Sequence, residues 1–158
     1  MPRDSGITPR HVIAVTALIS GVVALYLHLW KLGLTGPLAC GGSGGCVAVQ
    51  YSPWSWFLGV DVALIGTVGY TLILVVALTG TFDRWRDDPR LTWLLMALII
   101  PAFVFTLRLK YYEFFVMKTF CRWCAISAVT ITLHLVLVLL DRRRVARASS
   151  ARSHPSPA

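Results

Sequence analysis

Four cysteines, arranged as two pairs, give this chain its clearest capacity for chemistry. Cys40 and Cys46 flank a glycine-rich segment, Cys121 and Cys124 form a C-x-x-C motif, and the chain has no other cysteine. A C-x-x-C pair that opens a helix has a lowered thiol pKa, because free backbone N–H groups and the helix dipole favour the thiolate. Residues three apart share one face of a helix, so the two sulfurs can form a disulfide or face one ligand.

Two alternatives exist for these cysteines: a pair of structural disulfides, or a zinc site made of four thiolates. The CGGSGGC segment favours neither of them. Its spacer of five residues is longer than the roughly two to four residues usual in zinc sites, and its four glycines indicate a flexible loop rather than a staple. The spacing therefore predicts a relay between two dithiols, one of them on a flexible loop.

The elements that must position these cysteines are membrane-spanning helices. The chain has 158 residues, of which 56% are hydrophobic and 14% charged, and its mean hydropathy is +0.69. This composition excludes a typical soluble domain and a disordered chain. Helices that cross a membrane need about twenty apolar residues, and four runs in this chain come close to that length. They predict an all-α, integral membrane four-helix bundle over residues 11–140, with spans at 11–30, 60–78, 91–109 and 123–140.

Basic residues determine the predicted orientation of these spans. Residues 1–10, the connection 81–90 and residues 141–158 carry ten of the fifteen lysines and arginines. The positive-inside rule therefore places both termini in the cytoplasm of a cell membrane, and all four cysteines on its periplasmic or extracytoplasmic side, where disulfides form and persist. The net charge of +8 then orients the helices and implies no nucleic-acid partner. The basic tail, residues 141–158, ends in small polar residues and prolines and is expected to be disordered.

A thiol relay needs a final electron acceptor, because thiol–disulfide exchange moves oxidation without creating it. The sequence has no motif for haem attachment or for binding a flavin or a nucleotide. Cys124 lies one turn below Cys121, roughly 4.5 Å deeper at a rise of about 1.5 Å per residue. It is therefore placed to meet a molecule dissolved in the lipid, and a membrane quinone fits that position.

The order of these motifs resembles the vitamin K epoxide reductase family, and most of all its bacterial members that form disulfide bonds. The resemblance rests on Cys40-x5-Cys46, on the segment GVDVALIGTVGY at residues 59–70, and on the C-x-x-C that opens the last span. It covers about residues 12–140. The other membrane family that couples disulfide formation to quinones carries its C-x-x-C in the first outer loop, whereas in this chain the motif comes last.

The resemblance implies a bundle around a quinone of the menaquinone, ubiquinone or vitamin K type, with the quinone pocket near the outer surface. Cys124 would react with the quinone and pair with Cys121. Cys46 would exchange with Cys121, and Cys40 would exchange with a thioredoxin-like extracytoplasmic protein, so that electrons from this partner support disulfide-bond formation. Ser52 corresponds to a family serine that supports the active site by hydrogen bonding. Because the sequence ends soon after the fourth span, the partner is expected to be a separate protein.

Two positions depart from the family pattern. The animal enzymes bind the quinone carbonyls through a tyrosine and an asparagine, whose positions correspond here to Ala128 and Val62. Neither side chain can donate a hydrogen bond. This difference argues against epoxide reduction and leaves the hydrogen bonds to the quinone unassigned.

Asp61 stands where bacterial members often have proline. A carboxylate at the entrance of a span is costly if it faces lipid. It either relays the protons that quinone reduction consumes, or it faces outer water or pairs with a basic residue, for which the candidates are Arg108, Lys110 and Arg122.

Aromatic residues of the outer loops complete the expected site. Residues 53–58 (PWSWFL) begin with proline and contain two tryptophans, which predicts a short half-helix at the membrane interface. Trp54 in this segment would cover the quinone pocket or anchor the loop in the interface. Trp123, inside the C-x-x-C motif, would contact the quinone ring or mark the interface.

A non-catalytic membrane protein is the alternative function. Such an assembly or binding protein would have outer loops pinned by structural disulfides. A relay must exchange its disulfides with a partner, whereas a pinned loop only loses stability when a cysteine is removed.

Overall fold

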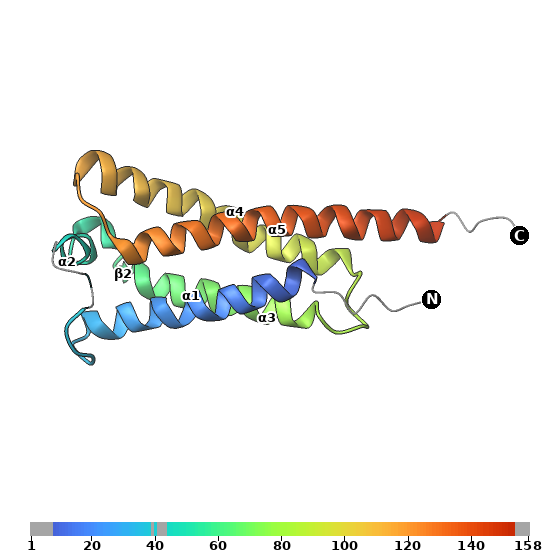
Figure 1. Ribbon diagram of the computed structural model, residues 1–158, viewed down its shortest axis with the longest axis horizontal. Coiled ribbons are helices and arrows are strands. Elements are labelled where there is room, and N and C mark those ends of the chain that lie inside the picture. The colour runs from blue at the N-terminus through green and yellow to red at the C-terminus, as the bar shows by residue number, and fades with distance from the viewer. Residues whose placement is uncertain (1–7, 39, 41–43, 154–158) are drawn as a thin grey trace, which may run out of the picture.

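Four long helices run side by side along the molecule in a computed structural model, which describes residues 8–38, 40 and 44–153 (Figure 1). They are α1 (Pro9–Lys31), α3 (Val62–Thr79), α4 (Pro89–Tyr111) and α5 (Arg122–Ser153). Within this described part, each of the four is long and apolar enough to cross a membrane. The prediction of an all-α four-helix membrane bundle is confirmed.

Proline and aspartate determine where three of these helices begin. Pro9 and Pro89 occupy the first turns of α1 and α4, where the N–H that proline lacks would have no partner within the helix. Asp88 caps α4 by accepting the Arg90 N–H at 2.8 Å, and Asp61 caps α3 in the same way. The capping residues therefore set the spans to within two or three residues of the apolar runs.

Small side chains bring α1 and α3 close together. Ala17 and Ala24 are buried on the inner face of α1, and a Cβ placed on Gly66 of α3 would lie 3.6 Å from the Ala24 Cβ. Large side chains such as Leu95 and Ile99 of α4 fill the centre of the bundle. Many other large apolar side chains point outward, as expected for helices that lipid surrounds.

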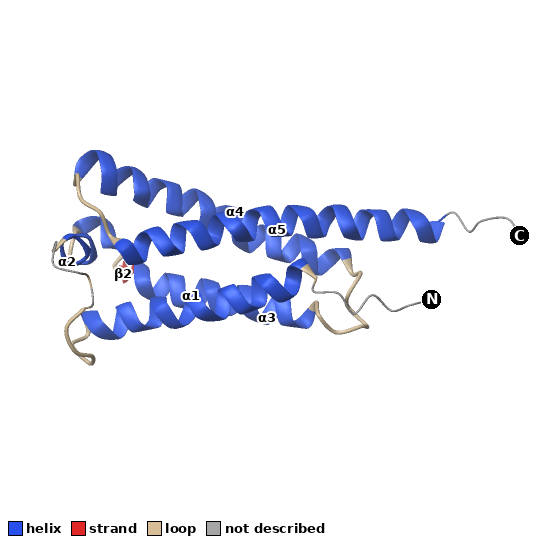
Figure 2. Cartoon of the chain, in the orientation of Figure 1, coloured by secondary structure: helices blue, strands red, loops and turns tan. Residues whose placement is uncertain are grey.

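Helix α2, which contains Cys46, and the start of α5, which follows Cys121, lie at the end of the bundle opposite to the start of α1 and the end of α5 (Figures 1 and 2). The segment between α1 and α3 contains the short helix α2 (Gly45–Gln50), a 3₁₀ turn at Pro53–Ser55, and a small hairpin of β1 (Trp56–Phe57) and β2 (Val60–Asp61). In this hairpin Trp56 pairs with Asp61. The predicted half-helix at residues 53–58 is confirmed only for its first half: Pro53–Ser55 form a 3₁₀ turn, whereas Trp56 and Phe57 form a strand. The α-helix of the first outer loop comes earlier, in α2.

The basic tail differs from its predicted disorder. Helix α5 continues as far as Ser153, so residues 141–153 are helical, whereas residues 154–158 lie outside the described part of the chain. Asp141 explains why the helix does not end with the apolar run. Its side chain is fully buried and forms an ion pair with Arg10 at 2.9 Å, and Arg144 lies 3.3 Å from its other oxygen.

Arg10 ties the ends of all four long helices together. Its fully buried guanidinium donates to Asp141 of α5 and to Thr92 of α4. It also donates to the carbonyl oxygens of Gly80 and Trp85, in the connection from α3 to α4. Arg10 is one of the basic residues that set the predicted orientation, and its hydrogen bonds also join the helix ends to one another.

Candidate active site

Three of the four cysteines form one buried cluster at the end of the bundle. Cys40 and Cys46 are joined by a disulfide, with their Cα atoms 6.0 Å apart. Cys121 packs into the same cluster and is fully buried. In contrast to the loop pair, Cys121 and Cys124 are both free thiols. The fold thus brings the loop pair against the C-x-x-C pair, as the relay hypothesis requires.

Gly45 allows this close approach. It is the first residue of α2 and precedes Cys46. A Cβ at Gly45 would lie 2.6 Å from the Phe120 carbonyl oxygen and 2.8 Å from the Thr119 hydroxyl, closer than real Cβ atoms come. Only glycine therefore lets α2 lie directly against the segment that leads into Cys121.

Cys121 caps the N-terminus of α5. Its sulfur accepts the Cys124 N–H at 3.4 Å, and its carbonyl oxygen accepts the Ala125 N–H at 3.0 Å. A hydrogen bond from the Cys124 thiol, together with those from the backbone N–H groups of Cys124 and Trp123, lowers the pKa of Cys121 to about 7, although burial opposes this shift. The Cys121 sulfur is therefore the more readily ionised nucleophile of a typical exchange pair.

Glu113, which the sequence interpretation missed, stands next to Cys121. It lies on a π-helical turn, Tyr112–Val116, that extends α4, and its side chain is buried. One carboxylate oxygen accepts the Cys121 N–H at 2.6 Å, and the other accepts Lys110 Nζ at 2.8 Å. A signal was present in the sequence, because Glu113 is the only glutamate of the chain and stands in an aromatic run.

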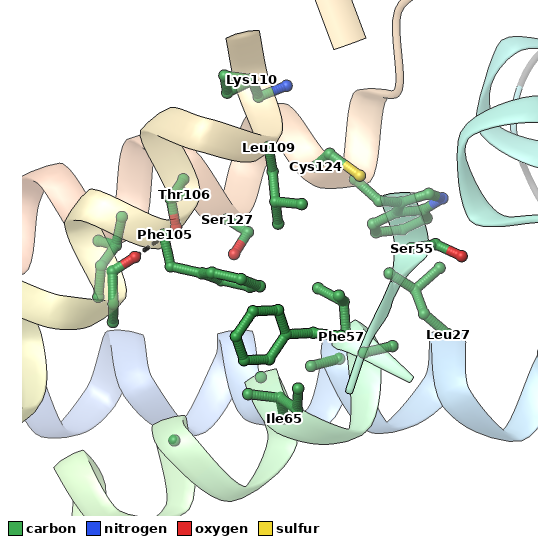
Figure 3. A pocket seen from close by; sticks show the side chains of 18 of the residues that line it. Leu27, Ser55, Phe57, Ile65, Phe105, Thr106, Leu109, Lys110, Cys124 and Ser127 are labelled. Atoms are coloured by element: carbon green, nitrogen blue, oxygen red, sulfur yellow. Dashed lines mark hydrogen bonds between the residues drawn. The ribbon is translucent and has the colours of Figure 1, made fainter. Parts of the chain in front are cut away.

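A largely apolar cavity of about 480 Å³ extends from Cys124 into the bundle (Figure 3). Aromatic side chains from the first outer loop and from α4 border it. Trp54 stacks on Tyr112 with ring centroids 3.7 Å apart, and Phe57 meets Phe105 edge to face at 5.2 Å.

Polar groups are few around this cavity. Near the sulfur, Gln50 Nε2 points to Cys124 Sγ at 3.8 Å. One helical turn farther along α5, the Ser127 hydroxyl hydrogen-bonds the Tyr70 hydroxyl at 2.9 Å. An apolar space with a few convergent polar groups is the usual form of a small-molecule site.

Most of the supporting residues expected from the sequence line this cavity. Trp54, Val62 and Trp123 are among its walls, as is Ser52, whose hydroxyl donates to the Val49 carbonyl oxygen at 2.7 Å. Ser52 thus stabilises the turn after α2. Ala128 is not part of the cavity wall, because it lies on another face of α5, in a surface depression lined by that helix alone.

Asp61 has different partners from the basic residues that the sequence suggested. Its buried carboxylate pairs with Lys31 and, at 2.8 Å, with His28 Nδ1, both on α1. Burial raises the pKa of Asp61, but the hydrogen bonds from Lys31, His28 and the Ala63 N–H together outweigh it and hold the pKa below its usual value. The expected pairing with Arg108, Lys110 or Arg122 is therefore wrong, and Asp61 joins the end of α1 to the start of α3.

Most of the chain matches a model of a known protein family. The family model described as "Vitamin K epoxide reductase family" matches residues 11–139. The match includes all four cysteines, the second and third spans in full, and most of the first and fourth spans.

Proposed function

The chain belongs to the vitamin K epoxide reductase family, and we propose that it is a membrane thiol–disulfide oxidoreductase that passes electrons from a thioredoxin-like protein to a quinone. A single observation carries the proposal: the Cys40–Cys46 disulfide packs against a free C-x-x-C pair, and Cys124 of that pair lines an apolar cavity. Family membership by itself supports a membrane redox function. The electron path, the quinone and the partner are the proposed part.

Electrons enter through the loop pair. The partner dithiol attacks the Cys40–Cys46 disulfide at Cys40, which has the higher exposed fraction of the two, 8% against 1%. The partner leaves as a disulfide, and Cys40 and Cys46 become thiols. The Cys46 thiolate then attacks Cys121 of a Cys121–Cys124 disulfide and releases Cys124. Attack of Cys40 on Cys46 re-forms the loop disulfide and releases Cys121, which leaves the C-x-x-C pair reduced.

The cavity fits a quinone ring. A bound quinone supplies an acceptor for the two electrons and two protons that the Cys121 and Cys124 thiols give up as they form a disulfide. The Cys124 sulfur lies in the cavity wall, in the first turn of α5. The family's quinone-binding tyrosine and asparagine are replaced in this chain by Ala128 and Val62. Gln50 near the Cys124 sulfur, and the Tyr70–Ser127 hydroxyl pair one turn deeper, supply hydrogen-bond donors in their place.

The orientation of the protein favours disulfide formation over reduction of a cytosolic substrate. Ten of the fifteen basic residues fall in three segments of the sequence, 1–10, 81–90 and 141–158. The start of α1, the connection between α3 and α4 and the end of α5 lie at the end of the bundle opposite to α2 (Figure 1). By the positive-inside rule the cysteine end faces the extracytoplasmic side, where oxidised thiols persist. The alternative, a non-catalytic protein with pinned loops, is less favourable because it gives no role to a free C-x-x-C pair beside a cavity.

The test uses purified protein in lipid vesicles with ubiquinone-1 or a menaquinone analogue, and reduced thioredoxin as the donor. We expect quinone reduction that depends on thioredoxin, and the loss of at least 90% of it when Cys40, Cys46, Cys121 or Cys124 is replaced by alanine. Ser149→Ala, at the far end of α5, is the matched control and should retain the full rate. Cysteine-independent reduction, or none with either quinone, would refute the proposal.

A further inference from the structure

The N-terminus of α5 has an unusual hydrogen-bond arrangement. In a capping box, the side chain of the N-cap residue accepts the N–H of the third helical residue, and the side chain of that third residue accepts the N-cap N–H in return. In α5 the N-cap is Cys121 and the third residue is Cys124, whose sulfur faces the cavity and does not bind the Cys121 N–H. Glu113, from the end of α4, accepts this N–H at 2.6 Å instead. A carboxylate from another helix therefore completes the cap at the reacting cysteine.

The carboxylate of Glu113 is itself held in place. Lys110 binds its second oxygen at 2.8 Å. The Lys110 ammonium also lies over the rings of Phe114 and Phe120, at 5.5 and 5.6 Å from their centroids. This side chain is therefore confined on several sides, and Glu113 has little freedom to turn away from Cys121.

Charge and geometry act in opposite directions at this site. The hydrogen bond from Glu113 keeps Cys121 in the N-cap position, where the helix N–H groups stabilise a thiolate. The negative charge of the same carboxylate disfavours that thiolate, and it raises the pKa of Cys121 against the larger lowering by Cys124. Lys110 offsets part of this charge.

We propose that Glu113 is a positioning residue of the relay: its carboxylate, held by Lys110, keeps Cys121 at the start of α5 and places beside the Cys121 sulfur a negative charge that Lys110 partly offsets. The inference rests on the proposed function, because Cys121 is the sulfur that exchanges with the loop pair. In that exchange the Cys46–Cys121 bond breaks as the Cys40–Cys46 bond forms, and Cys121 leaves as a thiolate with no other oxidant or reductant. A thiolate that forms too easily is a good leaving group but a weak attacking nucleophile.

The groups that surround Cys121 are few within the described part of the chain. Lys110 and Glu113 face it from the end of α4, and Arg122 and Cys124 belong to its own helix. From α2 and the segment before it comes the Cys40–Cys46 disulfide, which does not titrate, whereas the neutral Gln50 lies at Cys124. The Glu113–Lys110 pair is thus the charged feature that another helix presents to Cys121, and substitution can change it without touching a cysteine.

The experiment measures alkylation of Cys121 by iodoacetamide against pH in the purified, oxidised-loop form of the protein. Trypsin cleaves after Lys118 and Arg122, so Cys121 and Cys124 fall on separate peptides and mass spectrometry reads each one alone. Glu113→Gln keeps an oxygen that accepts the Cys121 N–H but removes the charge. At pH 6 we expect Cys121 of this variant to react roughly three- to tenfold faster than Cys121 of the wild type. This corresponds to a midpoint of the rate–pH curve that is lower by about half to one pH unit. The ratio of the two alkylation rates should approach one at pH 9, where the Cys121 thiol is ionised in both proteins.

Two further variants distinguish this role from simple support of the fold. Lys110→Met leaves the carboxylate unbalanced, so Cys121 should react several-fold more slowly at pH 6. Lys118→Gln removes an exposed charge of the same loop and should leave the profile unchanged. Support of the fold alone predicts that Glu113→Gln matches the wild type, because the hydrogen bond is kept.

An unchanged or slower Cys121 in Glu113→Gln, or equal shifts in Glu113→Gln and Lys118→Gln, would overturn the inference. The alkylation assay needs neither quinone nor partner. If it gives the expected shifts while the wild type shows no quinone reduction, the proposed function fails and the role of Glu113 in tuning Cys121 stands. If quinone reduction depends on the cysteines but the shifts are absent, the function stands and this inference fails.

Discussion

Replacing Gly45 by alanine tests whether the contact between α2 and the start of α5 carries electrons. A Cβ at this position would lie 2.6 Å from the Phe120 carbonyl oxygen, and ordinary van der Waals contact begins at 3.4 Å. The main chain of α2 must therefore move away by about 0.8 Å, because the obstacle is a backbone atom that cannot rotate aside. Cys46 is the next residue and moves with it, away from Cys121.

The expected effect is a slower exchange between the two cysteine pairs. A misplacement of reacting groups by about 1 Å costs up to about a hundredfold in rate. Part of the displacement relaxes because α2 has only six residues, so we expect roughly a ten- to thirtyfold loss. Overpacking also destabilises the protein by about 1–3 kcal/mol.

The assay separates exchange from reaction with the quinone. Fully reduced protein is mixed with ubiquinone-1, samples are quenched with an alkylating reagent, and the state of each cysteine is followed with time. In Gly45→Ala the Cys121–Cys124 disulfide should form at the wild-type rate, whereas the Cys40–Cys46 disulfide should form ten- to thirtyfold more slowly. Because both steps are read in the same molecules, a general loss of folded protein does not change their ratio.

Gly36→Ala is the matched control, since a Cβ there meets no atom within 4 Å and the residue lies in the same outer segment. It should leave both steps unchanged. A wild-type rate of Cys40–Cys46 oxidation in Gly45→Ala would refute the role of this contact. So would equal slowing of both steps.

Three further predictions concern the rest of the fold and the cavity. Arg10→Met should lower the free energy of unfolding in detergent by about 3–5 kcal/mol, because it removes the buried partner of the Asp141 carboxylate and leaves only the half-buried Arg144 to balance its charge; adding Asp141→Leu should recover most of the loss, and a further loss would contradict this. Asp61 has a lowered pKa, so its ionised form stabilises the fold above its ordinary value of 3.8, and stability falls as the pH drops below that value. Thermal unfolding from pH 6 to 3 should therefore show a decline that is reduced in Asp61→Asn, and parallel curves would argue against it. Tyr70→Phe removes one cavity hydroxyl and should raise the KM for the quinone about two- to tenfold with little change in kcat; an unchanged KM would exclude this hydroxyl from quinone binding.

The sequence was sufficient for the helices and for the cysteine pairs. Spans are set by the length of apolar runs, which is a local property, and the starts of α1, α3 and α4 shift only by a few residues to the nearest proline or aspartate. Two spans, α3 and α4, separate the first outer loop from the start of α5, so the chain returns to the same end and both cysteine pairs lie there. The family resemblance rested on the same local motifs, and the family match agrees with it.

Short elements in the loops escaped the sequence interpretation. Residues 53–58 look like a half-helix by composition, yet the helix of this loop is α2, which has no strong sequence pattern of its own. The position of α2 depends on the close contact between Gly45 and the Phe120 main chain, which is distant from it in the sequence. The helical tail depends in the same way on Arg10, which lies 131 residues from Asp141.

What the sequence determined by itself is the membrane bundle and the presence of two cysteine pairs at one end of it, because hydrophobic length and residue spacing act over neighbouring residues. Only the tertiary structure decided which charged group meets which partner. Asp61 binds Lys31 and His28 of α1, and Glu113 rather than any residue of α5 binds the Cys121 N–H. Such pairings follow from how separate helices end beside one another, and a buried polar group takes whichever partner the packing brings within hydrogen-bond distance.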